Sequence, residues 1–149
     1  MKKVFVMLFA VVIAASAWAT PTPSPEENDK VMAAFKEKFG DATQVSWTEK
    51  EGYLLVSFKL NNDRMLAWYT PDGEVEAVHR TIQTNQLTFL ASETVEKLMH
   101  DKSLLNLAEI SKHGELFYLA KIEDDKCISV YKISASGDYI RIEKTKKKK

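Results

Sequence analysis

The sequence matches itself without a gap when it is shifted by 64 residues, the distance from Val31 to Val95. Similar residue types then coincide along the two halves of the chain. The other matched pairs include Phe35 with Met99, Tyr53 with Phe117, Leu66 with Val130 and Gly73 with Gly137. A fixed internal period indicates that one supersecondary unit is present twice. We therefore expect two units, at about residues 26–83 and 92–144.

The local patterns predict the content of each unit. Apolar residues at helical spacing predict helices from Glu26 to Lys38 and from Ser92 onward. Alternating segments joined by short turns predict four strands after each helix. The expected strands are 44–50, 53–61, 64–70, 74–83, 105–112, 116–124, 127–134 and 138–144. The predicted fold is α+β, a tandem repeat of a helix and a four-stranded antiparallel meander, with both helices packed on one face of the sheet.

The N-terminal residues have the features of an export signal. Lys2 and Lys3 precede an apolar run, and Ala17-Trp18-Ala19 fits the small-x-small cleavage rule, so residues 1–19 are predicted to be a signal peptide. The alternative is a membrane anchor, but the run is shorter than the roughly 20 residues that span a bilayer. A Pro-rich linker at 20–25 follows. The mature protein is expected to be periplasmic or secreted, with no membrane span after cleavage.

The charge of the chain excludes one class of partner. Residues 145–149 are predicted to be a solvated Lys-rich tail. Without Lys2, Lys3 and the five lysines from position 144 onward, 14 basic residues face 21 acidic ones, and 14 − 21 = −7. An acidic body disfavours nucleic acid, whose binding requires neutralised phosphates. The role of the Lys-rich end is left open.

Alternation along the strands separates two faces of the sheet. Leu54, Val56 and Phe58 lie on the expected core side, which Val45, Trp47, Val78, Ile82, Ile140 and Ile142 are expected to complete. The other face carries apolar and aromatic residues where water alone would favour polar ones. Its candidate binding residues are Tyr53, Leu55, Trp68, Phe117, Leu119 and Tyr139. The alternatives are a misassigned register, which inverts a strand, or burial in a homodimer.

The sequence contains no motif that predicts catalysis, a metal or a cofactor. It has no Gly-rich phosphate loop and no short metal-ligand spacing between its His and Cys residues, which are His79, His100, His113 and Cys127. Cys127 is expected to be a small core residue. Asp124-Asp125 resembles a calcium-ligand cluster but lacks the spaced carboxylates of an EF-hand, so a hairpin turn explains it.

One stretch resembles a known family of exported bacterial proteins. The segment from Phe35 through Phe39, Ala42 and Val45 to Trp47 is similar to the start of the PepSY-like, or beta-lactamase-inhibitor-protein-like, family. Gly40 stands where that pattern usually has Pro, and 67–74 is similar to a second part of the pattern. The resemblance implies the helix-plus-four-strand unit in tandem and a role in binding protein or peptide. No inhibitory residues are carried over.

These observations predict a non-catalytic module that binds a protein or peptide of the cell envelope through the open sheet face. The alternative is a self-associating structural or envelope-stress protein. The sequence identifies neither the partner nor the oligomeric state.

Overall fold

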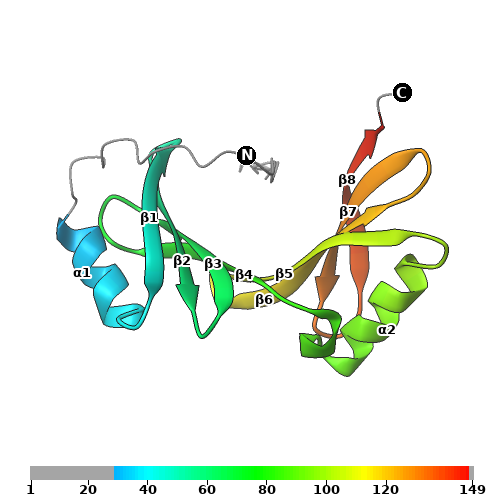
Figure 1. The fold of residues 1–149 in the computed structure, drawn as a ribbon, viewed down its shortest axis with the longest axis horizontal. Helices are drawn as coiled ribbons and strands as arrows, with labels where there is room; N and C mark the ends of the chain where they lie inside the picture. The colour runs from blue at the N-terminus through cyan, green and yellow to red at the C-terminus, as the bar shows by residue number, and fades with distance from the viewer. Residues whose placement is uncertain (1–28, 148–149) are drawn as a thin grey trace, which may run out of the picture.

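The computed structural model describes residues 29–147 (Figure 1). Within this range the chain forms two α-helices, one 3₁₀ helix and eight β-strands. The predicted signal peptide, the Pro-rich linker and the last two lysines lie outside the described residues. Every strand predicted from alternation is present, with ends that differ by at most a few residues.

The eight strands form one antiparallel sheet whose spatial order is the chain order. The strands are β1 (Thr43–Lys50), β2 (Tyr53–Leu60), β3 (Asp63–Tyr69), β4 (Val75–Thr81), β5 (Ser103–Lys112), β6 (Glu115–Glu123), β7 (Cys127–Ser134) and β8 (Tyr139–Lys146). Short hairpins join neighbouring strands, except between β4 and β5, where η1 (Thr84–Gln86) and α2 (Phe89–Leu98) intervene. The helix α1 (Asp29–Lys38) precedes β1.

The predicted architecture of a tandem helix-plus-four-strand repeat is wrong, although the α+β class is confirmed. The pairing of β4 with β5 overturns it: Ala77 to Thr81 pair with Lys112 to Ala108, so the eight strands are one continuous sheet rather than two meander units. The self-match of the sequence reflects similar local patterns, each set by a few neighbouring residues. It carries no information on which strands pair across the middle of the chain.

Two apolar clusters hold the helices against the sheet. The α1 cluster contains the buried residues Val31, Phe35, Phe39, Val56, Phe58, Ala67 and Tyr69. The α2 cluster contains Ile82, Ala91, Val95, Leu98, Leu107, Tyr118, Ala120, Ile122, Tyr131 and Ile133. Cross-strand register places both clusters on the same face, because facing side chains in an antiparallel pair point the same way. The helices lie at opposite ends of the sheet (Figure 1).

The start of α2 differs from the prediction. The helix begins at Phe89, and the hydroxyl of Thr88 accepts a hydrogen bond from the backbone N–H of Ala91 at 3.4 Å. Thr88 is therefore the N-cap, the position that a Ser or Thr hydroxyl fills well. The prediction placed the start at Ser92 because Glu93 and Glu96 favour the positive end of a helix. In the structure Phe89 and Leu90 extend the helix by exposed residues that lie outside its buried stripe.

The edge strands correct the predicted core. Val45 on β1 is exposed, as are Ile140 and Ile142 on β8, whereas Trp47, Val78 and Ile82 pack as expected. β1 and β8 pair on one side only, and the register shifts within both pairings, so alternation does not carry their apolar residues into the core. In addition, β8 extends to Lys146, beyond residue 144, where the domain was predicted to end.

One buried polar atom in the α1 cluster has no partner. Among the described residues, the Tyr69 hydroxyl is the only buried side-chain polar atom without a hydrogen bond. Burial raises the pKa of Tyr69 to about 12. The phenol therefore stays neutral, and its ring contributes to the core by apolar contact.

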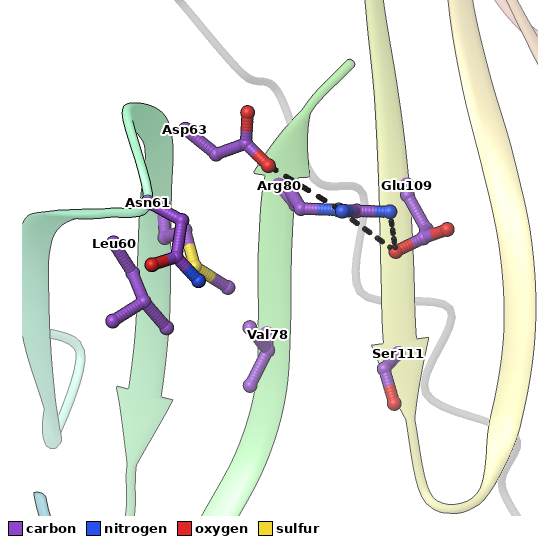
Figure 2. A pocket seen from close by; sticks show the side chains of 8 residues that line it. Leu60, Asn61, Asp63, Val78, Arg80, Glu109 and Ser111 are labelled. Atoms are coloured by element: carbon purple, nitrogen blue, oxygen red, sulfur yellow. Dashed lines mark hydrogen bonds and ion pairs between the residues drawn. The ribbon is translucent and has the colours of Figure 1, made fainter. Parts of the chain in front are cut away.

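A groove lies on the helix-bearing face in the middle of the sheet and is lined mainly by residues of β3, β4 and β5. Its volume is about 290 Å³, and Figure 2 shows Arg80 in its wall between Asp63 and Glu109. The guanidinium of Arg80 donates to Glu109 through Nε at 3.1 Å and reaches Asp63 through Nη1 at 3.4 Å. These carboxylates raise the pKa of Arg80, the Glu109 hydrogen bond most. Arg80 thus ties β4 to β3 and β5 at the middle of the sheet.

Candidate binding face

The open face is the side of the sheet opposite α1 and α2. Alternation places on it the residues that lie between the buried positions of each strand. Leu55 on β2 faces Trp68 on β3 directly, and Phe117 and Leu119 lie two residues apart on β6. All four side chains are half-buried. Tyr53, also half-buried, lies at the start of β2 two residues before Leu55. The structure therefore places five of the six predicted binding residues on this face.

Residues of β4 and β5, which the sequence reasoning missed, join the two groups. Trp68 faces Ala77, while the neighbouring row runs from Leu66 through His79 and Ile110 to Phe117. A third row places Ala108 beside Leu119. The apolar band of the open face is Leu55, Leu66, Trp68, Ala77, Ala108, Ile110, Phe117 and Leu119. Alternation along β5 would have placed Ala108 and Ile110 on the open face. Alternation along β4 did not show which of its residues lie on that face.

The sixth predicted residue, Tyr139, lies on the other face. It pairs with the fully buried Ile133, and its ring lies 6.1 Å from that of Tyr131 in the α2 cluster. Val75 at the start of β4, which strict alternation would also assign to the open face, packs against the α1 cluster. A register shift lies near each of these two residues. For Tyr139 it is the shift between Val130 and Tyr131 in the β7–β8 pairing, and for Val75 it is the shift between Trp68 and Tyr69 in the β3–β4 pairing. A shift of one residue inverts the facing of the strand beyond it.

His79 lies in the middle of the apolar band. Its neighbours across the strands are Leu66 on β3 and Ile110 on β5. Burial lowers the pKa of His79 below its ordinary value, because desolvation disfavours the charged imidazolium. The side chain is therefore neutral near pH 7, and the band carries no charge at its centre.

This position gives stability a measurable pH dependence. In the unfolded chain His79 takes up a proton near pH 6.5, whereas the folded protein resists protonation to lower pH. The free energy of unfolding should therefore fall as pH falls from about 7 to 5, a range above the titration of most carboxyls. Urea unfolding across this range should show the decline in wild type and a weaker one in His79→Gln. His100→Gln, at a largely exposed position, is the control and should keep the wild-type decline. Equal declines in all three proteins would contradict the assignment.

Charged side chains flank the band at both sides. Lys132 places its Nζ atom 4.1 Å from the ring centre of Phe117, a cation–π contact. At the β4–β5 junction, the Glu76 carboxylate lies 3.1 Å from Lys112 Nζ and 3.0 Å from His113 Nε2. The hydrogen bond from Lys112 is the main cause that lowers the pKa of Glu76, and His113 adds to it. These contacts orient long side chains beside the apolar residues.

The other chemically suggestive residues have structural roles. Asp124 accepts hydrogen bonds from the backbone N–H groups of Lys126 at 2.8 Å and Cys127 at 2.7 Å, which lower the pKa of Asp124. Cys127 itself is buried, as expected.

Across residues 29–147 no group of three His, Cys, Asp or Glu side chains is arranged to hold a metal ion. Over the same range no helix is long and apolar enough to cross a membrane.

Comparison with known proteins identifies the fold. No protein-family model matches the chain, and no curated protein matches it. A provisionally periplasmic protein from Bacteroides eggerthii superposes with a TM-score of 0.72 at 14% identity, covering 84% of this chain and 90% of that one. A DUF2874 family protein from Bacteroides uniformis gives 0.71 at 12% identity, covering 83% and 89%. A BLIP-like protein from Bacteroides fragilis gives 0.69 at 12% identity, covering 87% and 88%.

These similarities extend over most of each chain. The protein therefore shares the fold of a BLIP-like protein and of a DUF2874 family protein. At such identities the likeness shows the fold alone.

Proposed function

We propose that this protein is a non-catalytic binding module of the periplasm and that its open face contacts a protein or peptide. One observation carries the proposal: the apolar band extends across five neighbouring strands, β2 to β6, with the neutral His79 at its centre, on the face that neither helix covers. Aromatic side chains are enriched at the centres of protein interfaces, where burial of a large ring contributes much of the binding energy. Trp68 on β3 and Phe117 on β6 are the aromatic residues of this band and its expected anchors.

The proposed location rests on the N-terminal sequence and on the similar structures. Lys2, Lys3 and the apolar run that follows have the composition of an export signal. One similar structure is a provisionally periplasmic protein, and another is BLIP-like. We further assign the chain to the PepSY-like group on its Phe35-to-Trp47 pattern. The resemblance to an inhibitor fold supports binding rather than turnover.

Loss of both anchors should abolish capture of the partner without unfolding the protein. The test compares pull-downs from envelope extract with wild type, Trp68→Ala/Phe117→Ala and Phe89→Ala. Phe89 is the matched control because it is an aromatic residue that is 75% exposed and lies on α2, away from the open face. We expect a protein that wild type and Phe89→Ala retain and the double variant loses. Thermal melting of each protein shows whether it is folded.

Two outcomes would count against the proposal. If the double variant loses cooperative melting, Trp68 and Phe117 act as core residues rather than as a contact surface. If all three proteins capture nothing and wild type sediments as a dimer that dissociates on dilution, the open face serves self-association instead.

A further inference from the structure

The charges on the open face differ from those of the rest of the protein. Residues 29–147 contain 17 basic and 19 acidic side chains. Cross-strand register and ion pairs place ten of these charges on or beside the open face: the cations Lys50, Lys59, Arg64, Lys112, Lys121 and Lys132, and the anions Glu76, Glu115, Glu123 and Glu143. The open face thus has an excess of two positive charges, whereas the remaining described residues have 11 basic and 15 acidic side chains.

The anions of the open face are mostly neutralised within the protein. Glu76 pairs with Lys112 at 3.1 Å, and Glu123 pairs with Lys147 at 2.8 Å. Glu115 lies 3.9 Å from Lys132, at the limit of an ion pair. Only Glu143 makes no ion pair among the described residues, and its carboxylate accepts a hydrogen bond from Thr145. The negative charge is therefore largely compensated before a partner arrives.

Four cations of the open face, Lys50, Lys59, Arg64 and Lys121, are not compensated in this way. Lys59 and Arg64 face each other directly across β2 and β3, an arrangement of like charges that destabilises a sheet. Within the described range no carboxylate forms an ion pair with either of them or with Lys121. A partner that brings negative charge to this place would relieve the repulsion. The stability of the sheet does not account for this like-charged pair, whereas binding of a negatively charged partner would.

Lys59, Arg64 and Lys121, together with Lys132, border one long side of the apolar band. Arg64 lies two residues from Leu66 along β3, Lys121 lies two residues beyond Leu119 along β6, and Lys132 is the cross-strand neighbour of Leu119. A ligand that lies along the band would therefore meet apolar and aromatic groups in the middle and positive charge along this side. Such complementarity speeds encounter and excludes partners of the wrong charge.

We propose that the partner is a protein that presents an acidic segment, with Asp or Glu side chains against Lys59, Arg64 and Lys121 and an apolar side chain against Trp68 and Phe117. The inference rests on the proposed function of the open face and specifies its ligand. The apolar band distinguishes such a segment from a simple polyanion, which would need the cations alone.

A display library of random peptides, selected on the immobilised mature protein, tests this chemistry. Four proteins are compared: wild type, Lys59→Glu/Arg64→Glu, Trp68→Ala/Phe117→Ala and Lys36→Glu/Lys97→Glu. The last is the matched control, because it changes the net charge by the same amount on exposed positions of α1 and α2. We expect peptides from wild type and the control to contain at least twice the Asp and Glu content of the starting library. The Lys59→Glu/Arg64→Glu protein should bind these peptides at least tenfold more weakly.

The outcomes separate the inference from the proposed function. Peptides that depend on Trp68 and Phe117 but show no acidic enrichment would overturn the inference and leave the proposed function standing. Acidic peptides that bind the Trp68→Ala/Phe117→Ala protein as well as wild type, and that inorganic polyphosphate displaces completely, would indicate a polyanion site and overturn it too. No peptide selected above background by wild type would overturn both.

Discussion

Replacing Phe35 with alanine should lower the free energy of unfolding by about 3–5 kcal/mol, the range for truncating a buried aromatic side chain. Phe35 is buried on α1 and holds the helix to the sheet. Its ring centre lies 5.1 Å from that of Phe58, 5.2 Å from Trp47 and 5.6 Å from Phe39. The contacts with Phe58 and Trp47 are edge-to-face, and such contacts add to the energy of burial. The truncation would leave a cavity beneath the helix that rigid strands cannot close.

Urea unfolding monitored by circular dichroism measures the effect. Phe89→Ala is the control, because the same side chain is lost from an exposed position on α2; its change should stay within about 0.5 kcal/mol. A loss below about 1.5 kcal/mol for Phe35→Ala would mean that α1 does not depend on this contact. The account of the α1 cluster would then be wrong.

The second large effect is expected at Gly137, in the turn between β7 and β8. Gly137 has φ +87°, and a Cβ atom there would lie 2.8 Å from the carbonyl oxygen of Leu90 and 3.1 Å from Thr94 Oγ1. The Thr94 hydroxyl donates to the Gly137 carbonyl at 2.8 Å, so the turn is fixed to α2. Gly137→Ala should therefore cost both the left-handed backbone strain and a displacement of the helix from the turn.

Gly114→Ala separates these two causes. Gly114 has a similar φ, +80°, but a Cβ atom there would meet nothing within 4 Å. Its cost should be the backbone strain alone, roughly 1–2 kcal/mol, while Gly137→Ala should exceed it by about 1–3 kcal/mol of overpacking. Equal losses in urea unfolding would show that the turn tolerates the extra atom and that the contact with α2 is loose.

The strands were predictable because their signals are local. Alternation and turn residues such as Gly52 and Gly114 lie within a few positions of the structure they determine, and the observed strands follow them closely. The pairing of β4 with β5 could not be read in the same way. Those strands are separated by η1 and α2, so their contact depends on the packing of distant residues. The single continuous sheet was missed for this reason.

Alternation in the sequence predicted the residues of the candidate face correctly, except where a register shift intervenes. Leu55, Trp68, Phe117 and Leu119 lie in regular stretches of strand, where alternation assigns the face correctly. Tyr139 lies beyond a shift in the β7–β8 pairing, and one unpaired residue there moves it to the helix-bearing side. His79 was missed because alternation along β4 is ambiguous, and its place in the band follows from the pairing of β4 with β3 and β5.

The affinity of the captured partner for defined variants tests the central claim most directly. Isothermal titration calorimetry would compare wild type, Trp68→Ala/Phe117→Ala and Phe89→Ala at matched melting temperature. If Trp68 and Phe117 are anchors, each truncation should cost about 2 kcal/mol or more; the double variant should then bind at least a hundredfold more weakly and Phe89→Ala as wild type. Undiminished affinity of the double variant, with or without a loss in Phe89→Ala, would contradict a binding role for the open face.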